Sequence, residues 1–217
     1  MDAATPSPPT GSPLFSRIRL AVPSDVPHIH KLLHQMAAFE NHSHVCSTTE
    51  SDLSAHLFTS PPFQSVTTFI LEVSTKPFPE DSPHNSNANY IPVVRMLNSE
   101  HPVDDPDGEI FKSEDENVVV AGFVLFFPNF PSYTGRPGFF LEAFFVRKCY
   151  RRKGFGKMLL SAVAKQAVKM DYCEVFWLVK NWNVNAMRFY EDMGAQTVER
   201  KIYTLTGDAL QLHQNDD

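Results

Sequence analysis

The sequence predicts a single-domain α/β protein, and three observations support this fold class. The chain has 217 residues, the size of one domain with a substantial buried core. Runs rich in β-branched and aromatic residues alternate with segments whose apolar residues recur every three or four positions. An apolar run ending at Val146 also leads through a glycine-containing turn into such a helical pattern. This alternation indicates a sheet with helices packed on it.

The first half of the chain is expected to form three strands and two helices. Phe15–Ala21 alternates like a strand. Ser24 and Asp25 are expected to cap a helix whose apolar positions share one side: Ile29, Leu32, Leu33, Met36 and Phe39. The other elements predicted here are a helix at 50–57 and strands at 66–73 and 118–127.

The second half is expected to continue the alternation of strands and helices. The predicted elements are a strand at 139–146, a helix at 156–170, a strand at 175–179, a helix at 184–193 and a strand at 197–204. Gly194 follows the last of these helices and is suited to end it.

Three segments are expected to lie outside the regular structure of the domain at 15–210. Residues 1–14 are rich in proline and predict a disordered tail, and 211–217 predict a C-terminal tail. Residues 74–116 form an acidic insertion rich in Pro and Asn, with ten of the 25 acidic residues and three of the 19 basic ones. We expect it to be mobile and too polar to pack.

The composition favours a cytoplasmic protein. No apolar run approaches the length of a membrane span, and the N-terminus lacks the apolar core of a secretory signal, although a transit peptide is an alternative for the tail. Three cysteines form neither a disulfide framework nor a metal pattern. His30 and His34 have the spacing of a zinc pair, but no HExxH motif accompanies them, so we expect no metal.

The most informative segment is a basic turn at 147–157, which we call the glycine turn. Six Lys or Arg lie in it, and no acidic residue occurs between Glu142 and Asp171. The turn precedes a predicted helix, whose first N–H groups and dipole favour an anion, and glycine lets the main chain come close. Outside the insertion the chain is nearly neutral, which suits a polyanionic cofactor better than nucleic acid.

The spacing of the glycines excludes two common phosphate loops. One residue separates Gly154 from Gly156, so the Walker GxxxxGK[ST] pattern is absent. A dinucleotide GxGxxG would need a glycine at Leu159. The pattern that remains is Arg-x-x-Gly-x-Gly, from Arg151 to Gly156.

This pattern resembles the acyl-CoA diphosphate signature of the GNAT N-acetyltransferase superfamily. Leu141–Val146 is similar to the central strand of that family, and Asn181–Asn183 with Phe189–Tyr190 is similar to its last catalytic helix. The order is closest to the spermidine/spermine-type (diamine) acetyltransferases, including plant diamine/ornithine acetyltransferases and tyramine hydroxycinnamoyltransferases. The resemblance implies a mixed central sheet splayed between its fourth and fifth strands, helices on both faces, acetyl-CoA as acyl donor and a homodimer.

Two residues are candidates for proton transfer. An alkylamine with a pKa of about 10.4 is neutral in about one molecule in 2,500 at pH 7, and only the neutral amine attacks. Glu142, just before the glycine turn, could accept that proton, although an edge carboxylate or an Arg partner is the alternative. Strand alternation places it on one face with Phe144. The resemblance implies that Tyr190 protonates the leaving thiolate, and a packed tyrosine is the alternative.

Further residues are expected to bind the two substrates. The expected cofactor contacts are Phe144, Phe145, Val146, Arg151, Arg152, Lys153, Gly154, Phe155, Gly156, Lys157, Asn183 and Asn185. In this set, main-chain N–H groups at 144–146 would polarise the acyl carbonyl, and Asn183 would also cap its helix. By resemblance, the acceptor amine is expected to contact Phe39, Glu40, Phe176, Trp177 and Leu178, or these residues are ordinary core and rim. Arg147 and Lys148 are either a solvated rim or contacts of the CoA 3′-phosphate.

The functional expectation is N-acetylation of a small diamine or diamino acid, such as putrescine, diaminopropane or ornithine, by direct transfer. Ala143 and Asn181 stand where the family usually has acidic residues, which weakens the expectation for polycations. The alternatives are tyramine acylation with a hydroxycinnamoyl-CoA and a non-catalytic acyl-CoA-binding module. Cys149, among cations, is an alternative acyl-relay nucleophile.

Overall fold

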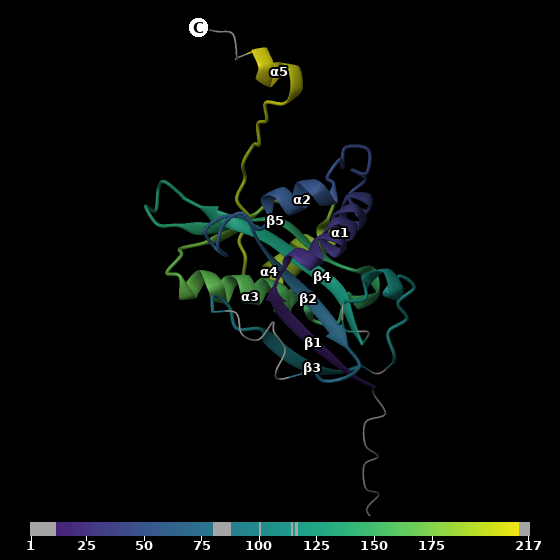
Figure 1. The fold of residues 1–217 in the computed structure, drawn as a ribbon. Helices are drawn as coiled ribbons and strands as arrows, with labels where there is room; N and C mark the ends of the chain where they lie inside the picture. The colour runs from purple at the N-terminus through teal and green to yellow at the C-terminus, as the bar shows by residue number, and fades with distance from the viewer. Residues whose placement is uncertain (1–11, 80–87, 100, 114, 116, 213–217) are drawn as a thin grey trace, which may run out of the picture. The chain divides into compact units, whose positions relative to one another are not determined.

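The computed structural model describes residues 12–79, 88–99, 101–113, 115 and 117–212 in two compact units (Figure 1). The first unit extends to Leu178, and the second begins at Val179. The strands of the first unit are β1 (Ser12–Leu20), β2 (Thr67–Ser74), β3 (Val93–Ser99), β4 (Val118–Asn129), β5 (Gly138–Val146) and β6 (Val175–Trp177). Its helices are α1 (Val26–Phe39), α2 (Glu50–His56) and α3 (Phe155–Lys169), with 3-10 turns at Pro23–Asp25, Gly108–Phe111 and Lys148–Tyr150. The second unit contains α4 (Val184–Asp192) and α5 (Gly207–Gln211).

The six strands form one mixed sheet in the order β3-β1-β2-β4-β5-β6. All neighbours are antiparallel except β5 and β6, which are parallel. Only three residue pairs join β5 to β6, and the last is Leu141 with Trp177. The pairing of these two strands therefore ends at Leu141. Because β3 was not predicted, β5 and β6 are the fourth and fifth strands predicted from the sequence, and the expected mixed, splayed sheet is confirmed.

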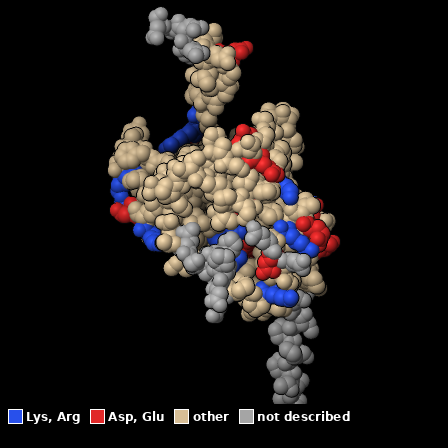
Figure 2. Space-filling model, viewed as in Figure 1, with Lys and Arg blue, Asp and Glu red and all other residues tan. Residues whose placement is uncertain are grey.

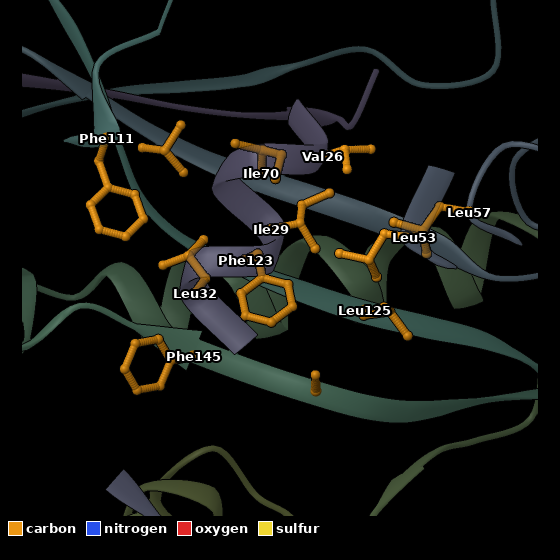
Figure 3. Close-up of a cluster of buried hydrophobic side chains, with 12 residues drawn as sticks. Val26, Ile29, Leu32, Leu53, Leu57, Ile70, Phe111, Phe123, Leu125 and Phe145 are labelled. Carbon is orange, nitrogen blue, oxygen red and sulfur yellow. The ribbon is translucent and has the colours of Figure 1, made fainter. Parts of the chain in front are cut away.

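The sheet is covered on both faces, as the complete burial of all eight residues of β2 requires. On one face, α1 and α2 pack on the central strands through a cluster of twelve buried side chains (Figure 3): Val26, Ile29, Leu32, Leu53, Leu57, Ile70, Phe111, Val120, Phe123, Leu125, Ala143 and Phe145. Arg19 lies opposite Ile70 of this cluster, so strand alternation puts Ser16 on the other face. There the Ser16 hydroxyl lies 3.5 Å from Met158 Sδ in α3.

The prediction that the Asp25 side chain caps the first helix is wrong, although the residue stands at the predicted position. Asp25 occupies the N-cap position of α1, but its side chain makes no capping hydrogen bond. Its carboxylate instead accepts hydrogen bonds of 2.6 and 2.8 Å from Arg19, which is fully buried, and one of 2.8 Å from the Val22 N–H. Arg19 shares its other carboxylate, the buried Glu72, with Arg17, so this cluster needs Asp25 to balance its second guanidinium. An uncompensated buried charge is far more costly than an open helix end, so Arg19 determines where the Asp25 carboxylate points.

The segment 74–116 was expected to be too polar to pack, and this expectation is wrong for much of its described part. Strand β3 pairs with β1 along its whole length, and Phe111 is fully buried in the apolar cluster. Some charges of this segment are paired locally, as in the 2.7 Å contact between Lys112 and Glu109. Acidic and basic atoms lie close together at the right of Figure 2, in the region of the teal loop of Figure 1.

Both ends of the predicted domain also need correction. Strand β1 begins at Ser12, so residues 12–14 belong to the sheet and not to a disordered tail, while 1–11 lie outside the described residues. No strand forms at 197–204 or elsewhere in the described part of the second unit, because an alternating segment becomes a strand only beside a partner strand. In the described ranges, no helix combines the length and apolar character needed to cross a lipid bilayer.

Candidate active site

Glu142 lies at an irregularity of β5, where that strand leaves β6. Leu125 of β4 pairs with Ala143, whereas Phe126 pairs with Leu141, so Glu142 is the extra residue of a β-bulge. Glu142 is exposed between two buried neighbours. A carboxylate on a bulge is held by the main chain on both sides and still reaches solvent, as a proton acceptor for a diffusing amine must.

The main chain after Glu142 points its polar groups toward the edge from which β6 has separated. The Arg147 N–H donates a hydrogen bond of 2.9 Å to the Ala121 carbonyl in β4. Because successive residues of a strand direct their N–H groups to alternate edges, Val146 and Phe144 direct theirs away from β4. This orientation is the one that the predicted contacts at Phe144 and Val146 need, whereas alternation directs the Phe145 N–H toward β4.

The glycine turn has the backbone of an anion site. Gly154 is the N-cap of α3 with φ of 82°, in the left-handed region that favours glycine, and a side chain added there would meet nothing within 4 Å. Helix α3 follows at Phe155, and its first turn contains no acidic residue. The first N–H groups of a helix have no intrahelical partner, so this helix start fits a diphosphate group.

Arg147 holds the start of this turn in place. The expectation that it is either a solvated rim residue or a contact of the CoA 3′-phosphate is therefore wrong. Its side chain is buried, and its two terminal nitrogens both donate to the Asp105 carboxylate, one of them at 2.8 Å. The guanidinium also lies 4.0 Å from the centre of the Phe111 ring, and Tyr150 donates a hydrogen bond of 2.9 Å to Asp105. The acidic segment therefore holds the start of the glycine turn, and Arg147 is not available to a phosphate.

The Asp105–Arg147 pair gives a stability prediction. Asp105→Asn should lower the free energy of unfolding by about 3–5 kcal/mol, because it leaves a buried guanidinium without a counter-charge. Urea denaturation followed by circular dichroism measures this change. Asp171→Asn is the matched control, since Asp171 and Arg136 form an exposed pair at 2.6 Å and its loss should leave stability nearly unchanged. Equal effects of the two variants would contradict this account.

Cys149 lies beside the same carboxylate. Burial and the negative charge of Asp105 raise the pKa of the Cys149 thiol above its usual value. This raised pKa disfavours the alternative of Cys149 as an acyl-relay nucleophile, because Arg147, whose charge would stabilise the thiolate, is already paired with Asp105.

Arg151, the first residue of the motif, turns its side chain away from the helix start. Its Nε donates a hydrogen bond of 2.8 Å to the Val146 carbonyl. The guanidinium carbon lies 4.6 Å from the centre of the Phe39 ring and 5.1 Å from that of Phe145. Burial between these rings lowers the pKa of Arg151 from its usual value, yet the guanidinium stays protonated at any physiological pH.

A cavity of about 260 Å³ opens between α1, the acidic segment and the start of the glycine turn, and we call it the α1 cavity. Its lining residues are Gln35, Ala38, Phe39, Asp105, Pro106, Asp107, Phe145, Arg147, Lys148, Cys149 and Arg151. Sequence reasoning missed Gln35, Asp105 and Asp107 as site residues. The only signal for the two aspartates was the acidic run at 104–107, which we interpreted as part of a solvated insertion, and Gln35 had no signal of its own.

The predicted acceptor residues are divided between two places in the first unit. Phe39 lines the α1 cavity, and Glu40 follows it as the C-cap of α1. Phe176 and Trp177 lie on β6, where the Phe176 ring centre is 5.0 Å from that of Phe140 on β5, and Leu178 follows them. The acceptor role of these residues stays a prediction.

The remaining predicted residues belong to the second unit, which is described by itself. Asn183 caps α4 as expected, with its side-chain oxygen accepting a hydrogen bond of 3.2 Å from the Ala186 N–H. Asn185 and Tyr190 lie on the same helix, and the Tyr190 ring centre is 5.3 Å from that of Phe189. Their roles toward CoA and the leaving thiolate stay predictions.

Comparison with known proteins agrees with this fold and glycine turn. The family model "Acetyltransferase (GNAT) family" matches residues 68–195, more than half of the chain. L-ornithine N5-acetyltransferase NATA1 of Arabidopsis thaliana is 55% identical over 94% of this chain and 90% of its own length. Tyramine N-feruloyltransferase 4/11 of Nicotiana tabacum is 32% identical over 91% and 90%. An integron cassette protein of V. cholerae has a similar fold, with a TM-score of 0.59 and 15% identity over 93% of this chain and 98% of that one.

A splayed mixed sheet whose glycine turn opens helix α3 agrees with the class that the family model and the relatives show, an acyltransferase of the N-acetyltransferase type. The chain belongs to the GNAT acetyltransferase family. It is an amine N-acyltransferase related to plant ornithine acetyltransferase and tyramine feruloyltransferase, which confirms the resemblance seen in the sequence.

Proposed function

We propose that this protein transfers the acetyl group of acetyl-CoA to the side-chain amine of L-ornithine. The observation that carries this proposal is the 55% identity, over nearly the whole chain, to a relative named as an L-ornithine N5-acetyltransferase. The start of α3 and the basic residues around Gly154 support a diphosphate-bearing donor. We expect the enzyme to act in the cytoplasm, as its cysteine pattern favours, and to be a homodimer, as the family resemblance implies.

The proposed reaction is a direct transfer. Glu142 removes a proton from the ammonium form, directly or through a water molecule, and the neutral amine attacks the thioester carbonyl. The main-chain N–H groups of Phe144 and Val146 stabilise the developing oxyanion. The carbon–sulfur bond then breaks, and Tyr190 gives its proton to the departing thiolate. The nitrogen gives its second proton to solvent, and the Tyr190 phenolate takes up a proton from solvent. The raised thiol pKa of Cys149 supports this route over an acyl-cysteine relay.

Putrescine and diaminopropane are further acceptors to test, and tyramine with feruloyl-CoA is the second candidate function. The 32% identity to a tobacco tyramine N-feruloyltransferase favours this second candidate, and so do the Phe39 and Phe145 rings in the α1 cavity. The aromatic donor and acceptor would both need apolar contact area.

A mass-shift assay with the purified protein tests the proposal. Each of two donors, acetyl-CoA and feruloyl-CoA, is combined with ornithine, putrescine, diaminopropane and tyramine. We expect a gain of one acetyl group on ornithine with the highest kcat/KM. Turnover restricted to feruloyl-CoA and tyramine would replace the first candidate by the second. Binding of CoA without acylation of any amine would instead indicate a non-catalytic module.

A further inference from the structure

We propose that the α1 cavity binds the α-amino acid head group of the acceptor, with Arg151 holding its α-carboxylate and Asp107 its α-ammonium. This inference rests on the proposed function and adds the residues that select a diamino acid over a simple diamine.

The first step of the argument is the state of the Arg151 guanidinium. It lies between the Phe39 and Phe145 rings, and its Nε is bonded to the Val146 carbonyl. Among the described residues, no carboxylate forms an ion pair with it, although it is half-buried. A guanidinium that lies beside two rings and belongs to the lining of a cavity fits a planar anion such as a carboxylate.

The second step is the opposite charge in the same cavity. The acidic segment supplies Asp107, which is also half-buried and accepts a hydrogen bond of 3.1 Å from Gln35 of α1. The other lining carboxylate, Asp105, is committed to Arg147 and Tyr150. Asp107 is therefore the available carboxylate of the lining, and Arg151 and the exposed Lys148 are its available cations. The cavity offers charges of both signs, which matches a zwitterion and not a dication.

The third step is the place of the cavity relative to the reacting atoms. Phe145 belongs to the buried cluster under α1, and three cavity residues, Gln35, Ala38 and Phe39, come from α1 itself. The cavity therefore opens on the α1 face of the sheet, whereas α3, whose first turn is the diphosphate site, packs on the other face. Acceptor and donor would then approach the same strand from different faces.

The length of ornithine fits this position. Arg151 is bonded to Val146, and Phe144, where the acyl carbonyl is expected, is two residues back on β5, a rise of about 7 Å. An amino acid whose carboxylate lies at Arg151 can reach that position with an amine at the end of a three-carbon side chain. Putrescine lacks the carboxylate and would leave Arg151 in the cavity without an anion.

The test compares two acceptors within each variant, so that a loss of activity common to both acceptors cancels in the ratio. The readout is the ratio of kcat/KM for ornithine to kcat/KM for putrescine, both with acetyl-CoA. Arg151→Gln should lower this ratio about 10- to 100-fold, because a site built to bind a charged group loses its discrimination when its partner is removed. Asp107→Asn should lower it about tenfold or more for the same reason. Arg151→Lys should fall between wild type and Arg151→Gln, because lysine keeps the charge and loses the forked geometry.

Arg152→Gln is the matched control, since it removes the same charge one residue away, at an exposed position outside the cavity lining. It should raise KM for acetyl-CoA and leave the acceptor ratio unchanged. If Arg151→Gln proves unstable, the acceptor ratio of Asp107→Asn provides the test, because Asp107 lies outside the glycine turn. A higher KM for acetyl-CoA with unchanged acceptor ratios in Arg151→Gln and Asp107→Asn would overturn the inference and assign Arg151 to the cofactor. Absence of any amine acetylation by the wild-type protein would refute the proposed function itself.

Discussion

Glu142→Gln should lower kcat for ornithine acetylation at pH 7 by about 10²- to 10⁴-fold, the usual contribution of a general base. Glutamine keeps the size and the hydrogen-bonding capacity of the side chain but cannot accept the proton. The β-bulge is a main-chain feature between β4 and β5, so the variant should retain its fold and its affinity for acetyl-CoA. Steady-state kinetics with both substrates varied separates the loss in kcat from any change in KM.

The pH profile distinguishes a base from a residue that only shapes the site. The neutral fraction of an alkylamine rises about tenfold per pH unit below its pKa of about 10.4. The activity of Glu142→Gln should therefore recover toward wild type between pH 7 and pH 9. Glu174→Gln, at an exposed carboxylate just before β6, is the matched control and should keep wild-type activity throughout. A deficit of Glu142→Gln that stays constant with pH would assign Glu142 a structural role.

The parts of the fold that were predictable are those with strong local signals. Helix α1 follows from its apolar periodicity, and strand β4 follows from its β-branched and aromatic residues. The glycine turn was predictable for a different reason. Its backbone needs a left-handed residue at Gly154, and its charges are contiguous in the chain.

The parts that were not predictable depend on contacts between distant segments. Strand β3 includes two valines, a methionine and a leucine, but it lies in a stretch that is otherwise rich in Pro, Asn and acidic residues, and it exists because β1 offers it an open edge. The segment 197–204 was expected to be a strand and finds no partner strand in its own unit. Local pattern sets the preference of a segment, and pairing decides whether a strand forms.

The same distinction applies to the candidate site. Glu142 and Gly154 lie in one continuous stretch of sequence, so a motif could find them. Asp105 and Asp107 reach the site from more than 40 positions upstream, because Arg147 must be neutralised where it is buried. The ion pair between Asp105 and Arg147 stabilises the fold and at the same time brings the acidic segment to the cavity. Composition alone could not indicate this placement.

Gly154→Val should weaken acetyl-CoA binding about 10- to 100-fold, because it removes at least one charge-assisted hydrogen bond worth about 1.5–3 kcal/mol. With φ of 82°, a β-branched residue is strained, and the new Cβ would stand in the open space above the helix start. The main chain can relieve this strain only by changing the directions of the N–H groups that we propose bind the diphosphate. Calorimetry with CoA measures the affinity, and KM for acetyl-CoA provides a second measure.

Gly135→Val separates this effect from simple backbone strain. Gly135 has φ of 63° and equally open surroundings, and it lies in the exposed loop between β4 and β5. Each substitution forces an L-residue into the left-handed region at a cost of about 1–2 kcal/mol, so both variants should lose similar stability in urea. Only Gly154→Val should lose affinity for CoA. If both variants bound CoA like the wild type, the diphosphate would have to be held by side chains, and the main-chain cradle at the start of α3 would be the wrong assignment.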